Sequence, residues 1–424
     1  MGWALPRVTR RDHGTEAAHL VTMSSPAEAR VDLGAIGDNV ALLRDRAAGA
    51  EVMAMVKAEG YGHGLVPAAR AALAGGATWL GVAKLAEGLE LHEAGLAGRS
   101  GVRTLVCLGV PGEPYGKGVQ AGLDLAAGAP WLVKEIAEAA RRTGVPARIH
   151  LKADTGMSRG GATGEDWPAL VDAALAAEAE GLLRVVGLMS HFACADEPGH
   201  PSIGRQLSAF QEMVEHAEKA GIRPEVRHLS NSAATLMIPE ARFDLVRPGI
   251  AVYGLTPVPR EGTFGLRPAM TLVAGAALLK RVPEGSGVSY GHTYVTGRGT
   301  NLALVPAGYG DGIPRHGSNV LEVLAAGRRR RIAGRVCMDQ FMIDLGDDTL
   351  AAGDEIVLFG TGERGEPTAQ EWADALGTIS YEIVTRIGSR VPRVYTGGPG
   401  AGPPRSAKPG NAEPGSVGTG SVDG

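Results

Sequence analysis

A lysine lies where an apolar run meets a glycine-rich turn. Residues 52–56 are all apolar, Lys57 follows them, and residues 58–64 contain three glycines. An apolar run that ends at glycines predicts a buried strand followed by a loop. The amine of a lysine at such a strand end is suited to Schiff-base chemistry with an aldehyde. From this segment alone, a lysine that merely extends to solvent is an equal alternative.

Other polar and cationic residues follow the ends of further predicted strands. In a (β/α)8 barrel the carboxyl ends of the strands meet at one mouth, where the active site lies. We therefore expect these side chains to face Lys57. They are Lys152, Arg159, His191, Asn231, Ser232, Arg247 and Gly249.

Two turns in this set are suited to an anion. Residues 231–234 (Asn-Ser-Ala-Ala) and 247–250 (Arg-Pro-Gly-Ile) offer backbone N–H groups beside small side chains. Each is weak by itself, because the first is typical of a helix N-cap and the second of an ordinary turn. Pyridoxal phosphate requires a lysine for its aldehyde and a pocket for its phosphate, so the combination predicts this cofactor.

Composition excludes several other classes. The chain has 424 residues and a formal net charge of −4, which favours neither nucleic acid nor an anionic membrane as partner. No apolar stretch has the length of a membrane span, and no apolar region typical of a signal peptide follows the early arginines. Three cysteines lack metal-site spacing, and His191 and His228 lack partners at ligand spacing. We expect reduced thiols, a cytoplasmic location and no metal.

Alternating strands and helices predict the fold. Eight short apolar runs between residues 52 and 246 alternate with amphipathic helical segments, which indicates parallel βαβ units and favours a (β/α)8 TIM-type barrel. A doubly wound open sheet is the alternative. The runs are 52–56, 78–83, 104–108, 123–127, 148–153, 185–191, 226–229 and 243–246.

The pattern changes after residue 257. Segments 270–281, 301–306, 320–325, 332–343 and 355–358 are β-rich with closely spaced turns, and a helix is expected at 368–376. We predict a barrel at 28–262, whose leading strand could instead join the second domain, and a mostly β domain at 263–395. Residues 1–27 are expected to form a flexible extension. Residues 396–424 lack the apolar side chains needed to fold and are expected to be a disordered tail.

At this point the chain resembles the bacterial alanine racemases. The matching segments in the barrel are 56–58 with 61–64, 152–159, 191–193, 231–234 and 247–250, and those in the β domain are 288–291, 308–312, 337–340 and 381–382. The resemblance spans residues 28 to 395. One difference is Glu59-Gly60, where many members carry Asn-Ala, and it concerns the loop rather than the chemistry.

The resemblance implies a role for each matching residue. Lys57 forms the aldimine with pyridoxal phosphate and is one of two catalytic bases, and Tyr290 is the other on the opposite face. Arg247 faces the pyridine nitrogen, and Arg159 and the backbone of Met338 bind the substrate carboxylate. The phosphate is held by Tyr61, Ser232, Gly249, Ile250 and Tyr381. The supporting residues are Lys152, as a carbamate or a plain amine, with His191, His228, Asn231 and Asp339.

The family also implies an assembly and an activity. Tyr290, Met338 and Asp339 come from the partner subunit in the family, which implies a homodimer with shared active sites. The implied activity is interconversion of L-alanine and D-alanine, which supplies D-alanine for peptidoglycan. A racemase of broader specificity is the alternative. A pyridoxal-phosphate carrier would lack the β domain, and a related decarboxylase would place a carboxylate where Arg247 stands.

Overall fold

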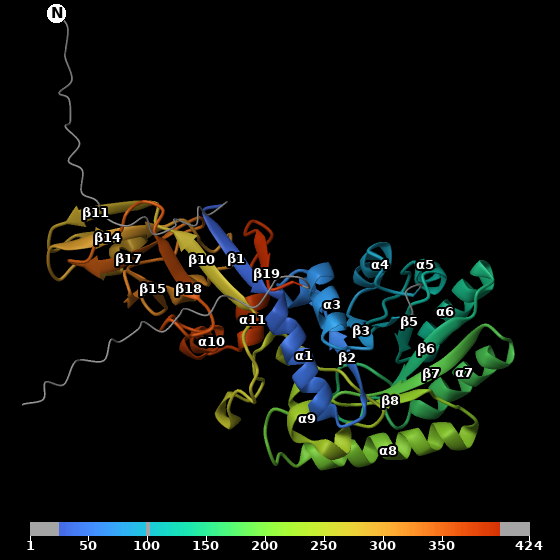
Figure 1. The fold of residues 1–424 in the computed structure, drawn as a ribbon. Coiled ribbons are helices and arrows are strands. Elements are labelled where there is room, and N and C mark those ends of the chain that lie inside the picture. Colours follow the sequence, from blue (N-terminus) through green and yellow to red (C-terminus); the bar gives the residue numbers. More distant parts are fainter. Residues whose placement is uncertain (1–24, 99–101, 399–424) are drawn as a thin grey trace, which may run out of the picture.

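The computed structural model describes residues 25–98 and 102–398. Its two parts are a barrel surrounded by helices and an elongated β domain beside it (Figure 1). The expectations of a flexible extension and of a disordered tail fall almost wholly on residues outside the described ranges. Within those ranges, no helix is both long and apolar enough to cross a membrane.

The barrel contains eight parallel strands among the described residues, in the spatial order β8-β7-β6-β5-β4-β3-β2-β9. Each expected run corresponds to one strand, so the predicted barrel is confirmed. The strands are β2 (Glu51–Met55), β3 (Trp79–Val82), β4 (Arg103–Val106), β5 (Asp124–Ala127), β6 (Ala147–Lys152), β7 (Leu183–Met189), β8 (Val226–His228) and β9 (Leu245–Val246).

The ring is nearly closed between β8 and β9. These two strands are not paired as a ladder, but the backbone N–H of Asp244 donates to the carbonyl of Arg227 at 3.1 Å, and that of Arg247 donates to the carbonyl of Ser230 at 2.9 Å. Arg247 is thereby fixed to the barrel wall at its carboxyl end.

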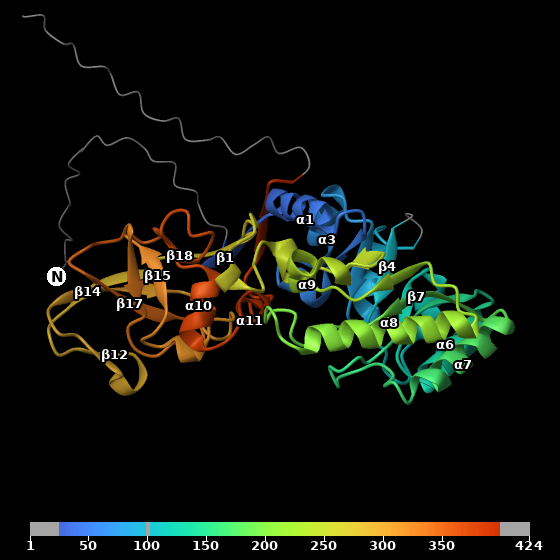
Figure 2. The ribbon, with the colours of Figure 1, turned by 90° about the horizontal axis from the view of Figure 1, so that it is seen from below.

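Helices cover the outside of the barrel (Figures 1 and 2). The helix α6 shows why, since it places six buried aliphatic side chains on one face and begins with a proline. The elements are α1 (Leu33–Ala47), α2 (Lys57–Tyr61), α3 (Leu65–Ala74), α4 (Leu85–Glu93), α5 (Tyr115–Gln120), α6 (Pro130–Thr143), α7 (Trp167–Ala179), α8 (Ser202–Ala220), α9 (Ser232–Met237), and the 3-10 turns η1 (Pro239–Ala241), η2 (Ile250–Tyr253) and η3 (Pro259–Glu261).

The β domain contains three sheets within the described ranges, in the orders β16-β15-β18-β10-β1-β19, β11-β14-β17 and β12-β13. Two helices close it, α10 (Ala369–Leu376) and α11 (Ser380–Thr385). The strands are β1 (Ala27–Asp32), β10 (Met270–Gly275), β11 (Leu278–Val282), β12 (Gly287–Val288), β13 (Tyr294–Val295), β14 (Thr300–Val305), β15 (Glu322–Ala325), β16 (Arg328–Arg331), β17 (Phe341–Gly346), β18 (Glu355–Phe359) and β19 (Arg393–Thr396), with turns η4 (Tyr290–His292) and η5 (Arg315–Gly317).

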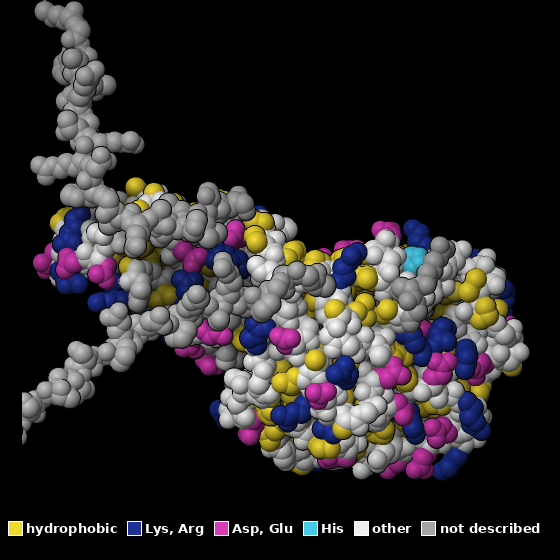
Figure 3. Space-filling view, in the orientation of Figure 1, with side chains coloured by type: hydrophobic (Ala, Val, Ile, Leu, Met, Phe, Trp, Pro, Cys, Tyr) yellow, Lys and Arg dark blue, Asp and Glu magenta, His cyan; other side chains and the backbone are white. Residues whose placement is uncertain are grey.

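The first strand among the described residues belongs to the β domain and not to the barrel. The strand β1 pairs antiparallel with β10 and parallel with β19. From residue 25 onward, the chain therefore runs through the β domain, forms the barrel and returns to the β domain. The arginine-rich segment 328–331 is the edge strand β16, and its charges protect that edge from pairing with another chain. Basic and acidic side chains are interspersed over the barrel face seen in Figure 3.

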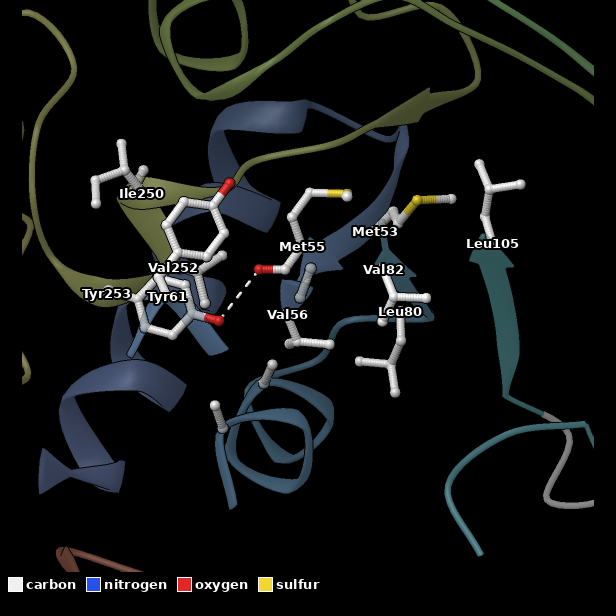
Figure 4. Packing of buried hydrophobic residues seen from close by; sticks show 14 of the residues in the cluster. Met53, Met55, Val56, Tyr61, Leu80, Val82, Leu105, Ile250, Val252 and Tyr253 are labelled. Atoms are coloured by element: carbon white, nitrogen blue, oxygen red, sulfur yellow. Dashed lines mark hydrogen bonds between the residues drawn. The ribbon is translucent and has the colours of Figure 1, made fainter. Parts of the chain in front are cut away.

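Buried side chains join the barrel wall to the site. Met55 projects from β2 beside Tyr61 and Tyr253, and Met53 lies on its other side, towards Leu105 (Figure 4); the hydroxyl of Tyr253 donates to the carbonyl of Met55 at 3.1 Å. Tyr61 and Tyr253 are stacked with ring centroids 5.0 Å apart. The strand end that carries Lys57 is therefore packed from both sides.

Candidate active site

Lys57 begins a left-handed turn. Ala58, Glu59, Gly60 and Tyr61 have φ of 53°, 56°, 58° and 52°, so four consecutive residues lie in the left-handed region. For a residue with a Cβ this conformation costs about 1–2 kcal/mol. Glycine is the favourable choice at position 60, and the Glu59-Gly60 pair that differs from many family members lies inside this turn. The sequence predicted a loop here, but not its handedness.

The strained turn is held by several groups around it. The carboxylate of Glu87 accepts the N–H of Ala58 at 2.7 Å and, through its other oxygen, the N–H groups of Ala83 and Lys84 at 2.9 Å each. The guanidinium of Arg393 donates to the carbonyl of Gly62 at 2.9 Å. Glu87 comes from α4 and Arg393 from the β domain, so both parts of the chain fix the position of Lys57.

The residues expected to bind phosphate meet beside this turn. The hydroxyl of Ser232 accepts the N–H of Gly249 at 2.7 Å and that of Ala251 at 3.4 Å. The Tyr61 hydroxyl lies so close to Gly249 that a Cβ there would be 2.2 Å from it. Tyr381, from α11 of the β domain, brings its ring within 6.2 Å of the Tyr61 ring. Burial raises the pKa of both tyrosines, so both hydroxyls remain protonated donors.

Ile250 and Asn231 complete this corner of the mouth. Ile250 is fully buried at the start of η2, directly after Gly249. Asn231 is the N-cap of α9, because its side chain accepts the N–H of Ala234 at 3.0 Å. Its observed contact is thus a capping bond, and it positions the neighbouring Ser232.

Four cations surround His191 at the mouth. Burial, followed by the charges of Arg247, Arg159, Lys57 and Lys152, lowers the pKa of His191 to about 3. Burial also lowers the pKa of Lys152. No ion pair joins these four cations to a carboxylate in the described ranges. Such a group of unpaired positive charges is stabilised by an anionic ligand.

Arg247 is buried and held by four acceptors. Its guanidinium donates to His228 Nδ1 at 3.0 Å, to His191 Nδ1 at 3.2 Å, and to the carbonyls of Ser190 and Leu229 at 2.7 and 3.3 Å. Burial lowers its pKa to about 10, so it keeps its charge at neutral pH. Donation to both imidazoles requires that each presents a lone pair.

The loop after β6 carries Arg159. A single carboxylate oxygen of Asp154 accepts the N–H groups of Gly156, Met157 and Ser158 at 2.9, 3.0 and 3.1 Å. These bonds hold the pKa of Asp154 below its ordinary value despite partial burial. They shape the loop that leads from Lys152 at the barrel wall to Arg159.

The remaining expected residues lie on the β domain. Tyr290, Met338 and Asp339 line one hollow, which contains no barrel residue. Tyr290 and Met338 are 72% and 53% exposed, whereas Tyr61, Ser232 and Arg247 of the barrel are buried. Asp339 accepts from Arg390 at 2.7 Å. Within one chain, therefore, the structure brings Tyr381 to Tyr61 of the barrel, whereas Tyr290, Met338 and Asp339 line a separate hollow of the β domain.

Sequence reasoning missed several residues at the site. Glu87 gave no signal, because an acidic residue near a helix start is common. Cys107 follows β4. Burial raises the pKa of its thiol, whereas the positive charges of Arg247, Lys152 and Lys57 act to lower it. The influence of these three cations places Cys107 at the same mouth. Its position near the end of the predicted run 104–108 was a usable signal. Asp124 and His150 lie inside predicted strands and were read as ordinary strand residues.

The donor set suits a phosphorylated aldehyde. Lys57 provides an amine at the mouth, the unpaired cations call for an anion, and a side chain at Gly249 would fill the space against Tyr61. A (β/α)8 barrel with such a mouth, joined to a β domain, defines the class of barrel enzymes that use pyridoxal phosphate.

Comparison with known proteins identifies the family. The alanine racemase N-terminal domain matches residues 31–257, and the alanine racemase C-terminal domain matches residues 269–395. An alanine racemase of Thermobifida fusca is 61% identical over 375 residues, which are 88% of this chain and 99% of that protein. The chain belongs to the alanine racemase family, and the resemblance seen in the sequence is confirmed.

Solved structures agree with this assignment. The alanine racemase from D-cycloserine-producing Streptomyces lavendulae superposes with a TM-score of 0.87 at 56% identity, covering 89% of this chain and 98% of that one. The alanine racemase of Streptomyces coelicolor gives 0.86 at 59% identity, covering 89% and 99%. The family is one of pyridoxal-phosphate-dependent isomerases, so the enzyme class is confirmed as well.

Proposed function

We propose that this protein interconverts L-alanine and D-alanine with pyridoxal 5'-phosphate as its cofactor, in the cytoplasm, and so supplies D-alanine for peptidoglycan. The observation that carries the proposal is the position of Lys57. Its amine stands at a barrel mouth with three other cations, next to a cradle formed by Tyr61, Ser232 and Gly249. Family membership over nearly the whole of the matched relatives supports the reaction.

Each part of the cradle would hold one part of the cofactor. Lys57 would bind its aldehyde, and Tyr61, Ser232, Gly249, Ile250 and Tyr381 its phosphate. The Arg247 guanidinium would face the ring nitrogen and keep it unprotonated, because Arg247 remains charged and can only donate. When bound, pyridoxal phosphate spreads the negative charge that develops on the substrate Cα as its proton leaves.

Two residues would move the proton. Lys57 Nζ would remove the α-proton of D-alanine on one face, and Tyr290 Oη would return a proton on the other face. The roles reverse for L-alanine. A free phenol with a pKa near 10 is a poor base near neutrality. The cations that the barrel mouth contributes, Arg247 first, would favour the phenolate. Arg159 and the backbone of Met338 would hold the substrate carboxylate.

We also propose that the active unit is a homodimer with two shared sites. The exposure of Tyr290 and Met338, and the absence of barrel residues from their hollow, support this proposal. A partner subunit would place its Tyr290 over Lys57 and cover both surfaces. The arrangement is isologous, so two sites form together.

A racemisation assay tests the reaction and its specificity. L-Alanine, L-serine and L-lysine are each incubated with the purified protein, and the D-enantiomer is measured with a coupled enzyme. We expect turnover of alanine well above that of the other two, and comparable turnover of all three would instead identify a racemase of broader specificity. No turnover of any substrate would refute the proposed function.

The cofactor is tested on the same preparation. The protein should be yellow, and borohydride should remove the visible band and leave the label on Lys57. Lys152 and Lys84 serve as internal controls, because they lie beside the mouth and at the N-cap of α4. A label on either of them would contradict the assignment of Lys57.

A further inference from the structure

A chain of buried polar groups crosses the interior of the barrel. Arg247 at the mouth donates to His228 Nδ1 at 3.0 Å, and His228 Nε2 lies 2.8 Å from His150 Nδ1. His150 Nε2 in turn lies 3.2 Å from a carboxylate oxygen of Asp124. His150 and His228 are completely buried, and Asp124 is 1% exposed. The site described above uses only the first two members of this chain.

The direction of every bond in the chain is determined. Arg247 can only donate, so His228 Nδ1 must carry a lone pair and His228 Nε2 a proton. That proton can be given only to a lone pair on His150 Nδ1. His150 Nε2 therefore carries a proton and donates it to Asp124. A carboxylate at the far end is the group that completes this order, because an ionised carboxylate only accepts.

Asp124, the last group of this hydrogen-bonded series, lies at the face of the barrel opposite the mouth. Asp124 is the first residue of β5, whereas Arg247 follows the end of β9. Two guanidinium groups fix Asp124: Arg148 Nε donates to one oxygen at 2.8 Å and Arg103 Nη2 to the other at 2.8 Å. Both arginines also contact Glu225, which is part of the surface at that face.

The barrel wall leaves space for this arrangement at one glycine. A Cβ at Gly187, on the strand next to His150, would lie 2.1 Å from His150 Nδ1. The Trp79 ring meets the His150 ring edge to face at 5.7 Å. The imidazole of His150 is thus confined between a glycine and an indole, with both nitrogens directed along the chain.

We propose that Asp124 and His150 are positioning residues for the racemase reaction. They hold His228 in the tautomer and orientation that accept from Arg247, and through it they fix the Arg247 guanidinium against the ring nitrogen of the cofactor. This inference rests on the proposed function. It assigns to the amino-terminal face of the barrel a role in the chemistry at the opposite mouth.

A double-mutant cycle on the holoenzyme tests the proposal. His150→Phe keeps a ring of similar shape but can neither donate nor accept a hydrogen bond. Arg247→Lys removes the guanidinium that the hydrogen-bonded series is proposed to position. We expect His150→Phe to lower kcat for alanine about tenfold in the native background, with little change in KM, and less than about twofold in the Arg247→Lys background. A role in folding alone would give the same factor in both backgrounds.

A spectroscopic readout accompanies the kinetics. The absorption spectrum of the bound cofactor should change in His150→Phe, because the guanidinium at its ring nitrogen becomes less ordered. His150→Gln can still accept from His228 and donate to Asp124, so it should restore part of kcat and of the native spectrum. An unchanged spectrum in His150→Phe, or equal kinetic factors in the two backgrounds, would overturn the proposal.

The matched control is Glu225→Gln. It changes a carboxylate that contacts the same two arginines as Asp124 but touches neither histidine. We expect it to leave kcat and the spectrum unchanged, and an effect equal to that of His150→Phe would refute the proposal. If His150→Phe does not fold, Gly187→Ala provides the same cycle, because it displaces the imidazole while keeping every polar group.

The design separates the two proposals. If the native enzyme racemises alanine while His150→Phe and Gly187→Ala behave like it, only the positioning role fails. If the native enzyme has no racemase activity, the proposed function fails first. The absorption spectrum of the bound cofactor is recorded for the native protein and the variants in both cases.

Discussion

The two halves of the candidate site are built differently. On the barrel, Arg247 is buried and bonded to groups of its own chain, and the turn after the half-buried Lys57 is held by Glu87 of the same chain. On the β domain, Tyr290 and Met338 stand 72% and 53% exposed, above a hollow that their own domain forms. The barrel half is formed within a single chain, whereas the β-domain half is an exposed surface that no barrel residue of the same chain covers.

This difference separates two physical requirements. The barrel half must hold a charged cofactor in one orientation, which needs buried, hydrogen-bonded groups on a rigid scaffold. In the proposed function, the β-domain half would provide a base on the opposite face of the substrate, and the proposed dimer would bring it from a second chain. The fold of one chain thus fixes the orientation of the barrel residues, whereas the proposed dimer would supply the residues that complete the site.

The strongest test of the comparison removes the hydroxyl of Tyr290, the proposed second base. In Tyr290→Phe we expect racemisation to fall by about 10²- to 10⁴-fold, the typical loss for a general base. Lys57 remains, so D-alanine should still exchange its α-proton with heavy water while L-alanine exchanges hardly at all. Proton NMR of the α-position measures both rates.

The control for this experiment is Tyr294→Phe. It makes the same chemical change in the same domain, at a hydroxyl that bonds to Asp344 and lies outside the hollow. It should leave both exchange rates near the native values. Equal exchange of the two enantiomers in Tyr290→Phe would show that Tyr290 is not the second base.

Mixing two inactive variants sharpens the comparison further. Lys57→Ala lacks the barrel half and Tyr290→Phe the β-domain half, so a hybrid dimer would contain one intact site and one empty of both residues. With random exchange of subunits about a quarter of native activity should return, since half the dimers are hybrids with one working site of two. Proof of subunit exchange by mass spectrometry, without recovery of activity, would contradict the shared site.

In the barrel half of the site, we expect the left-handed turn after Lys57 to depend on Glu87. Glu87→Gln replaces one of the carboxylate oxygens that accept from Ala58, Ala83 and Lys84 with an amide donor. Losing a typical intramolecular hydrogen bond costs about 0.5–1.5 kcal/mol, so unfolding by urea should need less denaturant and the cofactor should dissociate faster. Glu90→Gln, on the exposed face of the same helix, is the control. Identical behaviour of the two variants would mean that the left-handed turn does not depend on Glu87.

The smallest effect concerns pH. Burial lowers the pKa of His63 to about 4 and that of His228 well below its usual value. Below the unfolded pKa of about 6.5 the unfolded chain binds protons that the native protein does not, so stability should fall as the pH decreases from 7 towards 4. Each histidine contributes up to about 1.4 kcal/mol per pH unit.

Urea unfolding between pH 7.5 and 4.5 measures this slope. His63→Gln should lose the contribution of His63, while its amide can still donate to the carbonyls of Gly60 and Tyr61 that the imidazole contacts. A slope in His63→Gln equal to that of the native protein would show that His63 does not titrate as its burial requires.

Much of the architecture was accessible from the sequence, because periodicity is local. The alternation of apolar runs with amphipathic segments gave each barrel strand within a few residues, since burial of one face imposes that pattern on neighbouring positions. The strand β1 was not assigned with certainty, because its partners, β10 and β19, lie more than two hundred residues away. Pairing over such a distance leaves no trace in a short window.

The sequence by itself determined which chemical groups are present and at which strand ends they lie: Lys57, Arg159, Arg247 and the small residues around Ser232. Only the tertiary structure decided how they are oriented. The left-handed turn after Lys57 exists because Glu87 and Arg393 hold it, and the tautomer of His228 follows from Arg247, which can only donate to its Nδ1. Hydrogen-bond direction and backbone handedness depend on partners distant in the chain, so no local pattern of residues encodes them.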